Sequence, residues 1–245
     1  MAERRHYPNP PITEALIDLR VEPDATTTLN DLRGLETKIG ADYPTWNTKH
    51  LARGQIPLSP ELRTSASSKP IGFICKSADE KWVFQPQLEG FTLSRLAPYE
   101  RWELLRDEAR RLWQLYREVA RPRAIVRVAV RYINRIDLPL PAEDLKEFLL
   151  TVPEIAQGLP QHLAGFLMQV TLPMEDIQST ALISEVMIEP AMSGVASIVL
   201  DFDLFRTAEL PNDGMAVWDV LDLLHARENE LFEGCITDKT REMFH

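Results

Sequence analysis

One segment near the middle of the chain constrains the fold more than any other part of the sequence. Residues 125–138 contain no glycine or proline, and β-branched and aromatic side chains alternate with arginines there. A period of two is typical of a β-strand, in which successive side chains point to opposite faces of the sheet. One face would carry Arg127, Arg131 and Arg135, each about 13 Å from the next. The segment therefore predicts a long strand with one cationic face.

The composition predicts a folded, soluble protein. The chain has 245 residues, of which 44% are hydrophobic and 26% are charged, as in ordinary globular proteins. Its length fits one large domain or two fused small ones. Lys+Arg 27 against Asp+Glu 37 gives a net charge of −10, and an acidic chain repels nucleic acid and anionic membranes. We therefore expect neither nucleic acid nor a membrane as a partner.

Signals for targeting, cofactors and catalysis are missing from the sequence. No apolar run approaches the ~20 residues of a membrane span, and the first residues lack the apolar core of a signal peptide. The histidines have no metal-ligand spacing, and the glycines are scattered singly rather than gathered in a phosphate-binding loop. We therefore expect a cytoplasmic protein, with no cofactor, no metal site and no catalytic residue.

The order of the predicted elements repeats along the chain. In the first half we expect a strand, a helix, three short strands and a long helix, over residues 12–22, 28–41, 71–75, 81–88, 91–96 and 98–120. Residues 43–69, which mix prolines, serines and single aromatics, are expected to form a loop. In the second half the same order is expected over residues 125–138, 142–150, 166–172, 181–188, 195–206 and 212–234.

These elements predict a single α+β unit over residues 1–245, made of two similar structural halves, 1–122 and 123–245. Nearly every strand alternates apolar and polar residues, which is typical of a sheet covered on one side only. We expect a mostly antiparallel arrangement, as one curved sheet or two abutting sheets, with the two long helices packed on the apolar face.

The polar sides of several strands supply the candidate ligand-binding residues, which are Arg127, Arg131, Arg135, Arg20, Glu14, Asp201 and Asp203. Two interpretations remain open. Opposite charges on neighbouring strands can pair across the sheet, each pair contributing about 0.2 to 1 kcal/mol, as on a solvated surface. Alternatively, the sheet curves and its arginines line a concavity that binds an anionic ligand or an acidic peptide.

Three segments resemble a sporadically distributed family of uncharacterised bacterial proteins that are similar to this chain in length. They are Tyr-Pro-Asn-Pro-Pro-Ile-Thr-Glu-Ala at 7–15, Arg-Tyr-Ile-Asn-Arg-Ile at 131–136, and the closing stretch from Leu224 to Thr237. The resemblance spans essentially the whole chain, and it implies one full-length unit in the bacterial cytosol. It carries over no catalytic residue. A sporadic distribution is typical of mobile-element or defence genes.

Our leading hypothesis is a non-enzymatic binding or regulatory protein in a bacterial defence or toxin-control system, recognising a protein segment or an anionic ligand on its sheet. A protein partner is expected, and exposed strand edges favour a homodimer. One alternative is an enzyme acting on a phosphorylated or nucleotide ligand held by the arginines. Its architecture would resemble that of triphosphate-tunnel enzymes, although residues 14–18 lack their alternating glutamates. A second alternative is a SecB-like chaperone, which needs a large exposed apolar groove.

Overall fold

The computed structural model describes residues 7–55, 65–140, 144–190, 192–211 and 215–245. Within them, nine strands form one sheet in the order β2-β3-β4-β5-β1-β6-β9-β8-β7. Each strand pairs with its neighbours in antiparallel fashion. The predicted α+β class and the antiparallel sheet are therefore confirmed, and the sheet is continuous rather than divided into two.

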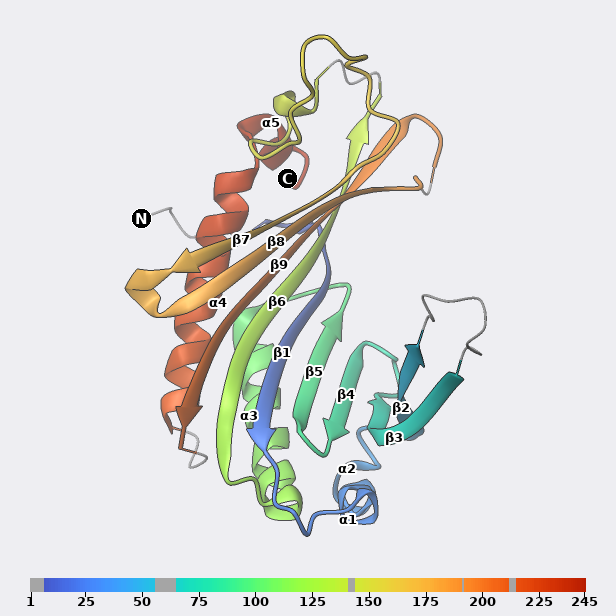
Figure 1. Ribbon diagram of the computed structural model, residues 1–245, viewed down its shortest axis with the longest axis vertical. Coiled ribbons are helices and arrows are strands. Elements are labelled where there is room, and N and C mark those ends of the chain that lie inside the picture. The colour runs from blue at the N-terminus through green and yellow to red at the C-terminus, as the bar shows by residue number, and fades with distance from the viewer. Residues whose placement is uncertain (1–6, 56–64, 141–143, 191, 212–214) are drawn as a thin grey trace.

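The sheet is centred on β1 (Ile12–Glu22) and β6 (Ala124–Pro139), which lie side by side (Figure 1). Both strands were predicted, and both alternate buried and partly exposed side chains. In β6 the apolar side consists of fully buried residues such as Val128, Val130 and Tyr132. The register shifts between Ile125 and Arg127, and this bulge turns Ile125 into the core as well. The arginines consequently share the opposite face.

On one side of this centre lie β5 (Gly90–Leu96), β4 (Trp82–Gln87), β3 (Ser65–Lys76) and β2 (Thr45–Gln55). The predicted loop over residues 43–69 is therefore wrong in its described parts, because β2 and the beginning of β3 pair there. Residues 56–64 lie outside the described residues. The backbone ladder with β3 holds β2, whose mostly polar side chains give no apolar alternation.

On the other side lie β9 (Val195–Leu210), β8 (Ser179–Ile188) and β7 (Leu167–Met174). These three strands were predicted, but β9 continues four residues beyond the predicted end at 206. Its register opposite β6 is unbroken from Arg127 to Pro139, and it places Asp203 opposite Arg131 and Asp201 opposite Ile133. The acidic residues of β9 thus lie beside the arginines of β6.

Two helices, α3 (Trp102–Ala120) and α4 (Met215–Cys235), pack on the apolar face and lie behind the sheet in Figure 1. Their inward side chains complete the core with those of the central strands. These side chains include Leu105, Leu112, Trp113, Tyr116, Leu221 and Leu224. Residues 212–214, at the start of the helix predicted over residues 212–234, lie outside the described residues. Both helices leave the arginine-bearing face uncovered.

Two predicted helices are wrong in extent. The helix expected over residues 28–41 is divided into α1 (Leu29–Arg33) and α2 (Glu36–Ile39), with Gly34 capping the first. The helix expected over residues 142–150 is reduced, in its described part, to the 3-10 turn η1 (Leu145–Glu147). Leu149 instead forms a bridge with Ile236, so backbone pairing with the C-terminal segment replaces a further helical turn. A second 3-10 turn, η2 (Glu175–Ile177), precedes β8, and α5 (Asp238–Glu242) ends the chain.

Candidate functional site

The charged face is the side of the sheet that carries Arg127, Arg131 and Arg135, and it is the side seen in Figure 1. The three arginine side chains are 26%, 41% and 29% exposed, respectively. They are neither buried nor fully solvated, because residues of the adjoining strands lie against them. Their chemistry therefore depends on the partners that those strands provide.

Arg127 and Arg131 each form an ion pair with a carboxylate of β9. Arg127 donates to both oxygens of Asp203, at 3.0 and 3.2 Å, and to Asp18 Oδ1 at 3.1 Å. Arg131 donates its Nε–H to Asp201 Oδ1 at 2.7 Å and a second N–H to the other oxygen. The bond to Asp201 raises the pKa of Arg131, and burial raises the pKa of Asp203 although both arginines oppose that shift. Two-pronged pairing of this kind fixes the direction of a guanidinium.

Arg135 forms a smaller group at the far end of β6. It donates to Asp137 Oδ1 and to Ser197 Oγ, both at 3.0 Å, and Ser197 donates to the same Asp137 oxygen. The Ser197 hydroxyl is the main cause of the lowered pKa of Asp137. The charge of Arg135 is therefore balanced within its own strand rather than by β9.

Asp18 connects β1 to this network. It is 6% exposed and accepts hydrogen bonds from Arg20 Nε at 3.0 Å, Arg127 Nη1 at 3.1 Å and Thr92 Oγ1 at 2.7 Å. Glu14 lies on the same face but forms no hydrogen bond or ion pair within the described residues, and it acts on Arg131 only through its charge. Of the predicted residues, the sheet thus brings Arg20, Arg127, Arg131, Asp201 and Asp203 together and leaves Glu14 and Arg135 outside.

Sequence analysis missed Lys49, which lies on β2 in the segment predicted to be a loop. Its ammonium group donates to Gln85 Oε1 on β4 at 2.8 Å. Burial lowers the pKa of Lys49, and the charge of Arg20 lowers it further. The charged face therefore extends from β9 across to the edge strand β2. The sequence offered little signal here, since over residues 47–53 only Lys49 and Arg53 carry a formal charge and no apolar alternation accompanies them.

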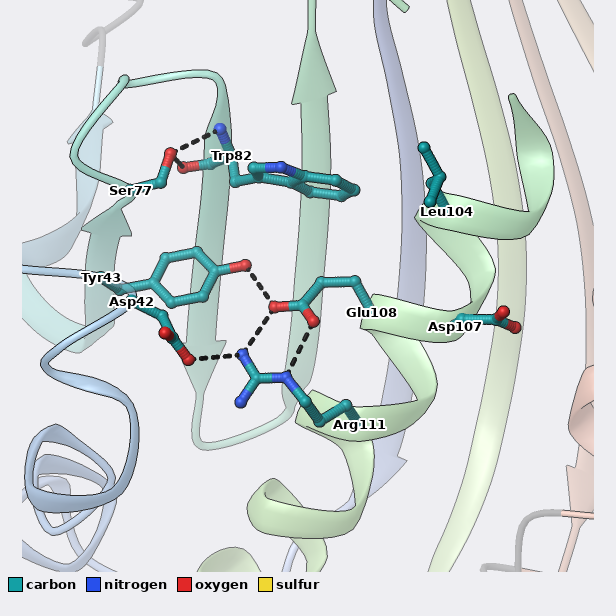
Figure 2. A pocket seen from close by; sticks show the side chains of 8 residues that line it. All are labelled: Asp42, Tyr43, Ser77, Trp82, Leu104, Asp107, Glu108 and Arg111. Carbon is teal, nitrogen blue, oxygen red and sulfur yellow. Dashed lines mark hydrogen bonds and ion pairs between the residues drawn. The ribbon is translucent and has the colours of Figure 1, made fainter. Parts of the chain in front are cut away.

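A separate cleft lies beside α3, and Figure 2 shows its lining side chains. Its volume is about 620 Å³, and it is lined by Asp42, Tyr43, Ser77, Trp82, Leu104, Asp107, Glu108 and Arg111. Tyr43 donates to Glu108 Oε1 at 2.8 Å, and Arg111 donates to both oxygens of Glu108 at 2.7 and 2.8 Å. Asp42 also pairs with Arg111, at 3.2 Å. The polar groups of this cleft are bound to one another, so their first effect is to join α3 to the β2 end of the sheet.

A third polar group lies under the helices, among aromatic side chains of β6, α3 and α4. The Tyr132 hydroxyl lies 2.9 Å from the Tyr99 hydroxyl and 3.0 Å from His225 Nδ1. The His225 ring stacks on Trp102 at 4.5 Å, and Trp102 Nε1 donates to Asp222 at 2.6 Å. This chain of contacts links β6, α3 and α4. It satisfies buried polar atoms, which favours a structural role.

Comparison with protein-family models and with curated proteins finds no match to the chain. None of the described helices is long and apolar enough to cross a membrane. In the described part of the chain, no group of three or more histidine, cysteine or acidic side chains could hold a metal ion. The charged face is therefore the candidate site.

Proposed function

We propose that the protein is a non-enzymatic binding or regulatory protein that recognises a protein segment on the charged face of its sheet. The observation that carries this proposal is the way the arginines are held. Each guanidinium on β6 is bound by a carboxylate and still reaches solvent. The face therefore offers fixed positive and negative charges side by side, which a peptide with mixed polar groups can complement.

The same pairing argues against a small phosphorylated ligand on the three arginines. A phosphate approaching Arg127 or Arg131 would meet the carboxylates of Asp18, Asp201 and Asp203, which already occupy the guanidinium donors. Like charges placed close together cost free energy unless one of them is displaced or protonated. A protein segment avoids this cost because its own donors can bind the carboxylates.

The proposal includes the organisation of the chain. We infer that residues 1–122 and 123–245 are two related halves of one α+β unit. The strand order supports this inference, because β3-β4-β5-β1 on one side mirrors β7-β8-β9-β6 on the other, and each half ends in a helix on the apolar face. The charged face would then be built around the junction of β1 and β6.

The proposal also includes the setting in which the protein acts. Its resemblance to a sporadically distributed bacterial family supports a cytoplasmic role in a defence or toxin-control system. Strands β2 and β7 end the described sheet, and each has a ladder partner on one side only. An unpaired edge can bind a second copy, so a homodimer belongs to the same proposal.

The test uses peptides selected from a random display library with the intact protein. The variant is Arg131→Gln with Asp201→Asn, which removes one ion pair without leaving a buried charge. We expect its affinity for the selected peptides to fall at least tenfold, because a charge-assisted hydrogen bond contributes about 1.5 to 3 kcal/mol. The matched control is Lys146→Gln with Glu154→Gln, which neutralises an exposed pair at 3.0 Å outside the sheet and should change affinity less than twofold.

Equal binding by both double variants would contradict the proposal. A screen of nucleotides, polyphosphates and divalent metals by thermal unfolding provides a second test. A rise in melting temperature with a nucleotide or polyphosphate that the Arg131→Gln, Asp201→Asn variant loses would support the enzyme alternative instead, since a ligand at 100 times its Kd adds roughly 2.7 kcal/mol to stability.

A further inference from the structure

Strand β7, at one end of the described sheet, has an open backbone edge (Figure 1). The Phe166 carbonyl accepts from the Met187 N–H at 3.0 Å, and in an antiparallel pair successive residues point alternately toward the partner strand and away from it. The backbone groups of Leu167, Gln169 and Thr171 therefore point away from β8. They form no backbone hydrogen bond within the described residues. The strand thus presents a short, regular ladder with room for one more strand.

Pro173 agrees with this alternation. It lies two residues after Thr171, so the position of its missing N–H is also on the open side of β7. Proline is tolerated in a sheet where its nitrogen faces an unpaired edge. Because Pro173 lies near the end of the strand, the three outward N–H groups before it remain available as donors.

The open edge of β7 carries no charge, unlike the opposite end of the sheet. Residues 163–174 contain neither an acidic nor a basic residue. At the other end, β2 carries Lys49 and its neighbour β3 carries Lys69. Charged side chains commonly protect an edge strand from pairing with another chain. Leu167 is 75% exposed, more than any other large apolar side chain among the described residues. The edge of β7 therefore lacks the usual protection.

The strand is complementary to a second copy of itself. Antiparallel pairing about a two-fold axis at Gln169 sets Gln169 opposite Gln169 and Leu167 opposite Thr171. All three outward N–H groups then have a carbonyl partner, and Pro173 lies beyond the paired region.

The side chains fit the same register. On the helix-covered side of β7 it places apolar residues opposite each other, because Met168 meets Val170 of the second copy and Phe166 meets Leu172. These four side chains are partly or largely exposed in the single chain. Cross-strand pairs of apolar side chains stabilise a sheet, and no like charges face each other in this arrangement.

We propose that the protein forms a homodimer through the open edge of β7, with the two strands paired about Gln169. This inference rests on the proposed function and makes its homodimer specific, because it assigns the edge and the register. The two-fold axis of an antiparallel pair is perpendicular to the sheet, so the charged faces of both copies lie on the same side of one continuous sheet. A partner with two recognition segments binds both faces at once.

Sedimentation of the full chain over a range of concentrations provides the test. The strand has eight residues, which is short for an interface, so we expect a reversible equilibrium between monomer and dimer. Gln169→Lys and Gln169→Glu each place like charges directly opposite one another at the two-fold axis. Each should raise the dissociation constant of the dimer at least tenfold.

An equimolar mixture of Gln169→Lys and Gln169→Glu should recover a dimer at least as tight as that of wild type, because opposite charges then face each other. A register that pairs Gln169 with itself predicts this recovery. Gln157→Lys is the matched control, since it makes the same chemical change at an exposed residue outside the sheet. It should change the dissociation constant less than twofold.

A wild-type protein that stays monomeric at every concentration, or a Gln169→Lys dimer as tight as that of wild type, would overturn the β7 interface. A mixture that does not recover the dimer would overturn the register. The peptides selected with the intact protein report separately on the charged face. If they lose affinity only for the Arg131→Gln, Asp201→Asn variant, the proposed function stands without the dimer. If wild type is monomeric and Gln169→Lys loses the peptides, the open edge binds peptide and the dimer is wrong.

Discussion

The acidic side chains on the two faces of the sheet differ in whether they have hydrogen-bond partners. On the charged face, Asp18, Asp201 and Asp203 each accept hydrogen bonds from an arginine. On the helix-covered face, Glu185 of β8 is fully buried, and both of its carboxyl oxygens lack a hydrogen-bond partner among the described residues. Glu228 of α4 is 4% exposed, and burial raises the pKa of its carboxyl to about 8.

The difference follows from what each face can accommodate. A guanidinium on the charged face can pair with a carboxylate and still keep part of its hydration, as the exposed fractions of the arginines show. Under α4 there is no solvent for a cation, so the carboxyl groups become neutral by holding a proton. Burial accordingly raises the pKa of Glu185 to about 7. Arginines balance the charge of the acids on the charged face, and bound protons remove the charge of the acids on the helix-covered face.

The largest effect should come from replacing a protonated acid. Burial raises the pKa of Glu228 in the folded protein to about 8, from 4.5 for an ordinary glutamate. Above pH 4.5 the unfolded chain loses this proton while the folded chain keeps it, so folding stability falls as pH rises to about 8. Glu228→Gln cannot ionise. It should therefore be more stable than wild type by on the order of 4 kcal/mol at pH 8 and by about 1 kcal/mol or less at pH 5.

Urea unfolding of both proteins between pH 5 and pH 8.5 measures this difference. Glu103→Gln is the matched control. Glu103 is exposed on the neighbouring helix α3, and its charge, like that of Glu228, raises the pKa of Tyr99 and Tyr132. Its difference from wild type should stay within about 0.5 kcal/mol over the range. If the difference in unfolding free energy between Glu228→Gln and wild type does not change with pH, Glu228 is not neutralised by a proton. The contrast between the two faces would then be wrong.

Much of the fold could be predicted because the central strands carry their own signal. Apolar, buried residues recur with period two at 15, 17, 19 and 21 in β1 and at 128, 130, 132, 136 and 138 in β6, so both strands could be located from this pattern. The edge strand β2 has no such signal. Its pairing with β3 depends on backbone hydrogen bonds, and its side chains from Asn47 to Leu51 are mostly exposed. Lys49 was missed for that reason.

The candidate site could be predicted only as a list of side chains on one face. Alternation placed Arg127 and Arg131 together, but it could not say that β1 and β9 flank β6, since strand order is a long-range property. The role of Asp18 depends on that order, because its partners Thr92, Arg20 and Arg127 come from three different strands.

An intermediate effect is expected at Asp18, the most buried acid of the charged face. Asp18→Asn removes the negative charge that Arg20 and Arg127 pair with, and it leaves one acceptor oxygen where two accept from Arg20, Arg127 and Thr92. Breaking a buried ion pair from one side typically costs a few kcal/mol, so we expect a loss of about 3 kcal/mol at pH 7. Thr92→Val, which removes only the 2.7 Å hydrogen bond, should cost about 1 kcal/mol. Urea unfolding measures both variants. If they lose the same unfolding free energy, the ion pairs of Asp18 do not stabilise the sheet as expected.

The smallest effect is expected at the pair of Arg131 and Asp201, even though its two-pronged geometry is the most regular on the face. Arg131 is 41% exposed, so water and salt already screen much of the attraction. A double-mutant cycle of Arg131→Gln and Asp201→Asn should give a coupling of about 1 kcal/mol, and less in 1 M salt. A coupling of several kcal/mol would mean that this pair holds the sheet together as Asp18 does. A coupling near 1 kcal/mol would leave its guanidinium available for a partner at little cost to the fold, as peptide recognition on this face requires.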